Sequence, residues 1–256
     1  MYRLRRKFSY SKIFLHDPKL VEKLIRKSSI GKKDTVLEIG SGKGIITSEL
    51  IKIAGKVIAV ELDSKLYQKL RVKFHNAANL KIYQGNFLNF KLPVGPYKVF
   101  SNLPFNITSS VIRKLTADEN FREGYLIVQK EAAKRFIGYP QDTKNSMVSL
   151  LLKPWFDISN YWKFRRSDFV PQPNVDTLMI RIIRVRQPLV DRNNANLYRD
   201  FVVYNYSRLN FAGLDSKTIL RKFESFVQRA SSKEKIKVSK KAGEYLKHQK
   251  SFHKIE

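Results

Sequence analysis

The segment Thr35-Val36-Leu37-Glu38-Ile39-Gly40-Ser41-Gly42-Lys43-Gly44 decides the fold class of this 256-residue chain. Residues 35–39 are rich in aliphatic and β-branched side chains, which predicts a short buried strand. Residues 45–54, after the glycines, have the apolar spacing of a helix. The spacing of the glycines is not that of a Walker A phosphate loop, but it permits a tight turn and close approach to a nucleoside-like ligand. We predict that Gly40, Ser41 and Gly42 contact such a ligand.

The following segments extend this pattern into a doubly wound α/β sheet. Strands are predicted at residues 56–61, 80–84, 97–100 and 125–128, and helices at 63–74 and 107–115. Another helix is predicted to start at Asp17-Pro18, with Asp17 as N-cap and Pro18 in the first turn. Glu61 ends the second strand, where an acidic side chain accepts hydrogen bonds from ribose hydroxyls. Asn86 follows the third strand and is predicted to bond the base edge of the ligand; the alternative is a turn residue.

The segment Ser101-Asn102-Leu103-Pro104-Phe105-Asn106 follows the fourth strand. Asn102 offers a side-chain carbonyl and Leu103 a backbone carbonyl, so two acceptors can hold one exocyclic amino group. Pro104 stiffens the turn, and Phe105 offers a ring for base stacking, a contact of about 1–3 kcal/mol per base. The alternative is an ordinary turn with a buried Phe. We call residues Asn102–Phe105 of this segment the clamp. Because the clamp and the glycine loop both follow strands of the predicted parallel sheet, they lie at the same edge, and we predict that they form one site.

The remainder of the chain predicts a rigid loop and a helical region. Residues 156–164 and 177–183 predict an antiparallel pair, and Pro171 and Pro173 between them exclude a central strand. We expect this loop to present Phe169 to a base. Helices are predicted at 196–207, 216–228 with Ser216 as N-cap, and 233–247. The predicted domains are residues 1–184, which include a basic arm at 1–16, and residues 185–256, a helical RNA-binding domain.

The charge of the chain indicates a polyanionic partner. There are 50 Lys and Arg against 22 Asp and Glu, a formal net charge of +28. We favour nucleic acid over an anionic membrane surface or a generally basic proteome. The expected contacts are basic side chains in the arm, in a helix at 129–135 and beside the proline loop: Arg5, Arg6, Lys7, Lys134, Arg135, Arg165 and Arg166. For those of the helix, a merely solvated face is the alternative.

Composition also excludes several classes of protein. The chain has no cysteine, and its four histidines lack metal-ligand spacing, so we expect no disulfide, no thiolate catalysis and no metal. No run of 18 apolar residues occurs, and the first residues lack the apolar region of a secretory signal. We therefore expect a soluble, cytoplasmic protein without a membrane partner, and a monomer by default.

Five segments together resemble the rRNA adenine-N6 dimethyltransferases, in particular the erythromycin-resistance (Erm) type. They are residues 11–15, 38–44, 61–63, 102–106 and 169–175. The resemblance implies a Rossmann-like methyltransferase fold, S-adenosylmethionine as cofactor, and methylation of large-subunit (23S) rRNA before ribosome assembly, which confers macrolide-lincosamide-streptogramin B resistance. It also implies that Phe14, Leu15 and Leu62 contact the cofactor together with the residues named above, Asn102 included.

The sequence departs from the family pattern at two places. Lys12 and Ile13 replace the two amide-bearing residues of the usual Ser-Gln-Asn-Phe-Leu segment. Asn86 replaces the usual Asp. Three alternatives stay open. A small-subunit (16S) rRNA dimethyltransferase shares the same motifs, a non-catalytic RNA-binding or transcription factor can use the same fold, and a DNA adenine methyltransferase shares the clamp but not the proline loop.

Overall fold

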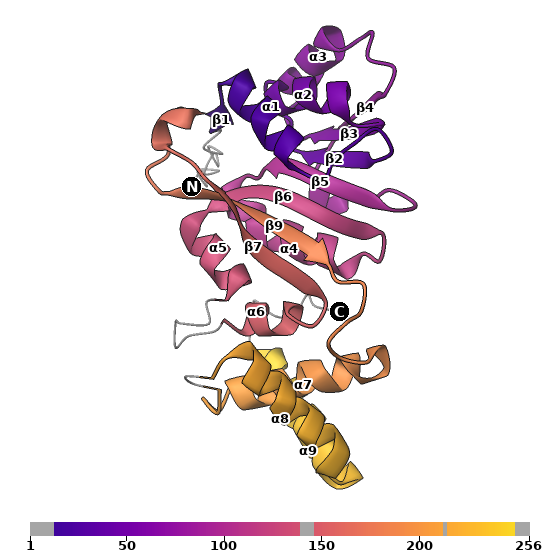
Figure 1. Cartoon of the computed structure of the whole chain (residues 1–256), viewed down its shortest axis with the longest axis vertical. Helices are drawn as coiled ribbons and strands as arrows, with labels where there is room; N and C mark the ends of the chain where they lie inside the picture. The colour runs from indigo at the N-terminus through magenta and orange to yellow at the C-terminus, as the bar shows by residue number, and fades with distance from the viewer. Residues whose placement is uncertain (1–12, 139–145, 212–213, 249–256) are drawn as a thin grey trace, which may run out of the picture. The chain divides into compact units, whose positions relative to one another are not determined.

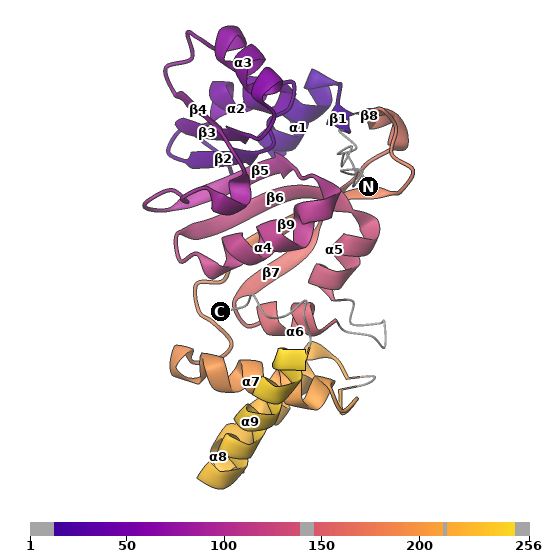
Figure 2. The ribbon, with the colours of Figure 1, turned by 180° about the vertical axis from the view of Figure 1, so that it is seen from behind.

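The structure of the protein is a computed structural model that describes residues 13–138, 146–211 and 214–248. Figure 1 and Figure 2 show it from two opposite sides. Within these ranges, no helix is both long enough and apolar enough to cross a membrane.

The chain forms two compact units. The first comprises Met1–Lys130 with Tyr161–Ile180, and the second comprises Glu131–Asn160 with Arg181–Glu256. The segment 131–160 thus belongs to the same unit as the later helices. The physical reason is burial, because helix α6 (Met147–Leu152) places apolar side chains in the same buried cluster as helices further along the chain.

A seven-stranded sheet with the order β4-β3-β2-β5-β6-β9-β7 is the main element of the fold. Its strands are, in chain order, β2 (Thr35–Ile39), β3 (Lys56–Glu61), β4 (Leu80–Gln84), β5 (Tyr97–Asn102), β6 (Phe121–Gln129), β7 (Phe156–Lys163) and β9 (Thr177–Arg184). The neighbours from β4 to β6 are all parallel. This confirms the predicted doubly wound α/β class.

The order of the strands reverses between β2 and β5. From β2 the chain proceeds through β3 to β4 at one edge, and then returns to place β5 on the other side of β2. Open α/β sheets bind ligands at such a switch point, outside the carboxyl ends of the strands. The glycine loop follows β2. Asn102 is the last residue of β5, which extends two residues beyond the predicted end and pairs Asn102 with Ile127 of β6.

Helices cover both faces of the sheet. Helix α1 (Pro18–Lys27) lies beside α2 (Ile45–Ile53), and Figure 1 shows α1 on the side facing the viewer. Figure 2 brings α4 (Thr108–Ala117) to the front of the sheet. Helix α1 begins as predicted, because the Asp17 carboxylate accepts from the Lys19 amide at 2.9 Å and Pro18 occupies the first helical turn.

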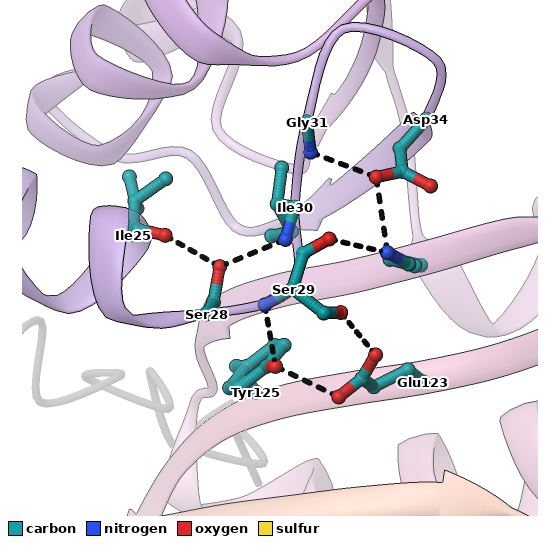
Figure 3. Close-up of polar contacts among 9 residues, drawn as sticks. Ile25, Ser28, Ser29, Ile30, Gly31, Asp34, Glu123 and Tyr125 are labelled. Atoms are coloured by element: carbon teal, nitrogen blue, oxygen red, sulfur yellow. Dashed lines mark hydrogen bonds and ion pairs between the residues drawn. The ribbon is translucent and has the colours of Figure 1, made fainter.

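A buried polar network holds the connection between α1 and β2 against the sheet (Figure 3). The carboxylate of Glu123, which is 6% exposed, accepts from the hydroxyl of Tyr125 at 2.7 Å and from that of Ser29. The Ser29 amide donates to the Tyr125 hydroxyl at 2.9 Å, and Lys98 donates to the Ser29 carbonyl at 2.6 Å. Burial of its hydroxyl raises the pKa of Tyr125. These bonds satisfy buried polar groups near the amino ends of β5 and β6, away from the carboxyl ends.

The second unit has its own apolar core. Helices α7 (Ala195–Tyr206), α8 (Ser216–Arg229) and α9 (Ser232–His248) contribute to it, with Tyr198, Phe201 and Phe223 among its largest side chains. The three helices confirm the predicted helical pattern. The predicted cap is wrong by one residue: Asp215 caps α8 by accepting from the Thr218 amide at 2.8 Å, because its carboxylate reaches the free amides of the first turn.

Candidate active site

A cavity of about 290 Å³ lies in the first unit at the switch point of the sheet. This is near the lower end of ligand-site volumes, roughly 300–1,000 Å³. Most of the predicted site residues line it: Phe14, Gly40, Gly42, Glu61, Leu62, Asn86, Asn102, Leu103, Pro104 and Phe105. The cavity therefore brings the predicted ligand loop and the predicted base clamp together.

Glu61 ties the glycine loop to the end of β3. One carboxylate oxygen accepts from the Gly42 amide at 2.8 Å, and the other accepts from the Asp63 amide at 2.8 Å. Its backbone carbonyl accepts from the Gly85 amide at 2.9 Å, which draws in the segment after β4. Glu61 is 6% exposed and still lines the cavity. Glu61, predicted to bind ribose, therefore also connects three sheet-edge loops, two through its side chain and one through its backbone carbonyl.

Glu38 supports the loop from below without lining the cavity. It is 1% exposed, and one carboxylate oxygen accepts from the Thr47 hydroxyl at 2.6 Å. Burial raises its pKa from 4.5 to about 7; the hydroxyls of Thr47 and Ser41 counteract this rise, and the charge of Glu61 adds to it. Glu38 therefore connects the end of β2 to α2 through the Thr47 hydroxyl.

The clamp is held in place from two sides. The amide nitrogen of Asn102 donates to the Ile13 carbonyl at 2.7 Å, which leaves its carbonyl oxygen as the acceptor for a ligand. The Leu103 amide donates to the Ile127 carbonyl at 3.1 Å, and Phe105 is half-buried on the cavity wall. Ile13 acts here through its backbone carbonyl, which does not depend on the side chain at this position.

Two distant motifs meet in a small antiparallel sheet. Strand β1 (Phe14–Leu15) pairs with β8 (Phe169–Val170), which places Phe14 opposite Val170. The Phe14 ring packs on Gly42, where an added Cβ would lie 2.5 Å from the ring. Lys43 lies above the same ring, 5.2 Å from its centroid. Strand β1 and the start of the proline loop thus lie side by side next to the glycine loop.

Three of the predicted contact residues have buried side chains, and their contacts stay predictions. Phe169 is 1% exposed and packs edge-on against Phe164 with a 5.2 Å centroid separation, so its ring belongs to the apolar core in this structure. Leu15 is 4% exposed and belongs to the same apolar core. Ser41 is 5% exposed and is not among the cavity residues. The strand pair β1–β8 turns Leu15 and Phe169 inward, which local sequence does not reveal.

The segment after β4 forms the opposite wall. Asn86 lines the cavity, and its carbonyl oxygen accepts from the Leu88 amide at 2.9 Å, capping the short helix η1 (Phe87–Asn89). The turn and the binding interpretations of Asn86 are therefore compatible. Eight further residues that line the cavity were not predicted from the sequence: Ile13, Ile39, Val60, Asp63, Leu66, Gly85, Phe87 and Ile107. Several adjoin predicted residues in the chain, but Leu66 and Ile107 carry no local signal.

The predicted RNA-binding residues have mixed environments. Arg5, Arg6 and Lys7, like Lys12, lie outside the described residues. Arg135 and Arg165 are exposed. Two others have acidic neighbours, since Lys134 pairs with Glu131 at 2.9 Å and Arg166 with Asp176 at 3.4 Å. Among residues 13–138, 146–211 and 214–248, no three acidic or histidine side chains gather as a metal site. RNA binding by these residues stays a prediction.

Comparisons with known proteins agree on the family. The model of the family described as "Ribosomal RNA adenine dimethylase" matches residues 3–254. An rRNA adenine N-6-methyltransferase of Bacillus licheniformis is 35% identical over 192 residues, which cover 74% of this chain. The chain spans just under two thirds of that relative, 66% of its length. A ribosomal RNA small subunit methyltransferase A of Geobacter sulfurreducens is 32% identical, covering 76% of this chain and 73% of its own.

Solved structures show the same relationship. The 23S rRNA methyltransferase ErmE superposes with a TM-score of 0.70 and 26% identity, covering 76% of this chain and 79% of its own. A dimethyladenosine transferase from Plasmodium falciparum superposes with a TM-score of 0.66 and is 26% identical, and the match covers 77% of each chain. Together with the switch-point cavity, which unites the glycine loop and the clamp, these matches show that the chain belongs to the ribosomal RNA adenine dimethylase family, a family of S-adenosylmethionine-dependent methyltransferases.

Proposed function

We propose that the protein methylates the N6 amine of an adenine in large-subunit rRNA with S-adenosylmethionine as methyl donor, and that this confers macrolide-lincosamide-streptogramin B resistance. The observation that carries the proposal is the shared cavity, because the clamp Asn102–Phe105 and the glycine loop both line it. A donor held by the loop and an amine held by the clamp would then lie next to each other.

The residues present fit the nucleoside part of the donor. Gly42 has φ +56°, and because it has no Cβ the Phe14 ring can pack against the glycine loop beside the cavity. Glu61 supplies a buried carboxylate for ribose hydroxyls, and Leu62, 51% exposed, supplies an apolar surface for a flat base. When bound, S-adenosylmethionine supplies an electrophilic methyl group on a positively charged sulfur.

The chain itself contributes orientation. The N6 lone pair of adenine is delocalised into the ring, so the amine is a weak nucleophile until acceptors localise it. The carbonyl oxygen of Asn102 and the backbone carbonyl of Leu103 are the two acceptors for the N6 hydrogens, and the Phe105 ring stacks on the base. Positioning of this kind accounts for most of the rate gain, and no strong base is required because the product ammonium loses its proton to water.

The substrate is proposed to be naked rRNA in the cytoplasm, before ribosome assembly, with the protein acting as a monomer. Single-stranded or looped RNA lets a base leave its stack at low cost. The large net positive charge and the basic helical unit supply backbone contacts, so binding should weaken with salt. The similarity to ErmE, a 23S rRNA methyltransferase, supports the large-subunit target.

The second candidate is methylation of small-subunit rRNA. It is supported by the Geobacter sulfurreducens relative, whose name specifies the small subunit and whose identity of 32% is close to the 35% of the Bacillus licheniformis relative. A non-catalytic RNA-binding factor is the candidate of another class. The hydrogen bond from the Asn102 amide nitrogen to the Ile13 carbonyl argues against this candidate. It orients the Asn102 carbonyl oxygen as an acceptor for an amine, which methyl transfer requires and RNA binding alone does not.

The test is transfer of radiolabelled methyl groups to naked large- and small-subunit rRNA in parallel, followed by mapping of the modified adenines. We expect label in large-subunit rRNA alone, and raised macrolide tolerance in a sensitive host that expresses the protein. Label only in small-subunit rRNA would favour the second candidate. No label in either, despite cofactor and RNA binding, would favour the non-catalytic factor.

A matched pair of variants tests the clamp. Asn102→Ala removes the acceptor and should lower transfer by about 100-fold or more, the usual cost of removing one transition-state contact, while binding of S-adenosylhomocysteine persists. Asn106→Ala alters an exposed amide of the same segment that does not line the cavity, and transfer should be retained. Equal turnover of both variants would refute the assigned role of Asn102.

A further inference from the structure

Lys114 makes an unusual set of contacts from the second turn of α4. Its ammonium nitrogen lies 3.0 Å from the Phe87 carbonyl oxygen, 2.8 Å from that of Leu88 and 2.5 Å from that of Phe90. It also lies 5.1 Å from the centroid of the Phe87 ring. All of these acceptors belong to η1 or to the residue that follows it, and Phe87 among them lines the cavity.

The chemistry of these contacts is specific for a lysine. An ammonium group has three hydrogens, and here each has one carbonyl acceptor. Hydrogen bonds from a charged donor are roughly twice as strong as those between neutral groups. Lys114 is half-buried, and desolvation lowers its pKa. A lysine without such partners would extend into water, so the half-buried position depends on the three carbonyls.

The segment that Lys114 holds carries two residues of the cavity. Asn86 and Phe87 both line it, and the Asn86 side chain is bonded to the Leu88 amide at 2.9 Å. The position of η1 therefore sets the position of the Asn86 amide and of the Phe87 ring. Helix α4, which carries Lys114, begins at Thr108, directly after the clamp and the short helix η2 (Phe105–Ile107). Lys114 thus links the helix that follows the clamp to the segment that carries Asn86 and Phe87.

We propose that Lys114 is a positioning residue that fixes the wall formed by Asn86 and Phe87 relative to the clamp, and so determines affinity for the nucleoside half of the methyl donor. The inference rests on the proposed function, because it assigns this wall to the cofactor. It adds a residue that is outside the cavity and was not among the predicted site residues.

The test compares three variants of the full chain. Lys114→Met removes the charge and all three hydrogen bonds but keeps an unbranched side chain, whereas Lys114→Arg keeps the charge with a planar group that cannot direct its hydrogens to the same three carbonyls. Lys69→Met removes an exposed lysine of α3 (Ser64–Lys73) as the charge-matched control. Calorimetry measures the dissociation constant of S-adenosylhomocysteine, and steady-state assays with rRNA measure KM for S-adenosylmethionine and kcat.

We expect Lys114→Met to weaken binding of S-adenosylhomocysteine by about tenfold, because Asn86 and Phe87 are then no longer held in place. KM for S-adenosylmethionine should rise similarly while kcat and KM for rRNA stay near the wild-type values. Lys114→Arg should be intermediate, and Lys69→Met should be unchanged. A purely structural lysine would instead lower the thermal midpoint and the active fraction without altering the dissociation constant.

The outcomes separate the inference from the proposed function. Wild-type protein that binds S-adenosylhomocysteine, with Lys114→Met binding it equally well, would overturn the inference alone. A fall in kcat with unchanged cofactor constants would also overturn it. Absence of S-adenosylhomocysteine binding by the wild-type protein would overturn the proposed function and the inference together.

Discussion

Replacement of the buried Glu38 by Gln should make the stability of the protein less dependent on pH. Glu38 is 1% exposed and its pKa is raised to about 7, chiefly by burial. The Gln side chain has nearly the same shape and still offers a carbonyl oxygen to the Thr47 hydroxyl, which now donates to the carboxylate at 2.6 Å. The substitution therefore removes the titration while it keeps the main contact.

The size and sign of the effect follow from the two pKa values. In the unfolded chain the carboxyl titrates near 4.5, and in the folded protein near 7, so between these values the folded state binds more protons. Stability associated with the protonated carboxyl is fully present below pH 4.5 and is lost as the pH rises through 7. At about 1.4 kcal/mol for each pH unit, the wild-type protein loses about 3 kcal/mol across this window.

Urea unfolding at a series of pH values from 4.5 to 8 measures this loss. We expect the free energy of unfolding of Glu38→Gln, relative to wild type, to increase by about 3 kcal/mol from the lowest pH to the highest. Glu119→Gln removes an exposed carboxylate of the same unit and serves as the control for the change in net charge. Parallel pH profiles for Glu38→Gln and wild type would refute the assignment of a titrating buried carboxyl.

Two further predictions concern the glycine loop and the Glu61 carboxylate that bonds to it. Glu61→Ala leaves the amides of Gly42 and Asp63 without their acceptor, so we expect a loss of about 1–3 kcal/mol of stability, and S-adenosylhomocysteine should bind more weakly. Thermal melts with and without this ligand measure both effects, and an unchanged ligand-induced shift would contradict the ribose role. Gly42→Ala places a Cβ 2.5 Å from the Phe14 ring at φ +56°, which should cost at least about 1–2 kcal/mol and weaken ligand binding by displacing that ring. The control Gly243→Ala has no atom within 4 Å of the added Cβ, and should be neutral or stabilising by about 0.5–1 kcal/mol; a similar loss in both variants would show that contact with Phe14 is not the cause.

Local patterns predicted most of the sheet that carries the site. The strand at Thr35–Ile39, the glycine loop and the strand at Lys56–Glu61 lie where the sequence places them, and the loop glycines do adopt positive φ. These features depend on residues that are close in the chain. Asn102 and Phe105 were likewise found from a short motif, and the structure places both on the wall of the cavity.

Contacts between distant segments were beyond sequence analysis. The hydrogen bond from Asn102 to the Ile13 carbonyl joins residues 89 positions apart, and the three bonds of Lys114 join it to residues 24–27 positions away. Neither contact has a local signature, because a backbone carbonyl is present at every residue and only the fold decides which one a side chain meets. The same holds for the inward orientation of Phe169, which follows from the pairing of β8 with β1.

The sequence by itself determined the α/β class, the glycine loop, the clamp motif and the basic charge of the protein, because each is encoded in residue types at short spacing. Only the tertiary structure decided which loops share a cavity and which predicted residues line it. It also decided that Glu38 titrates near pH 7, since that pKa depends on the depth of burial. Burial and long-range hydrogen bonding arise when the strands assemble, and therefore the final composition of the site is a property of the folded chain.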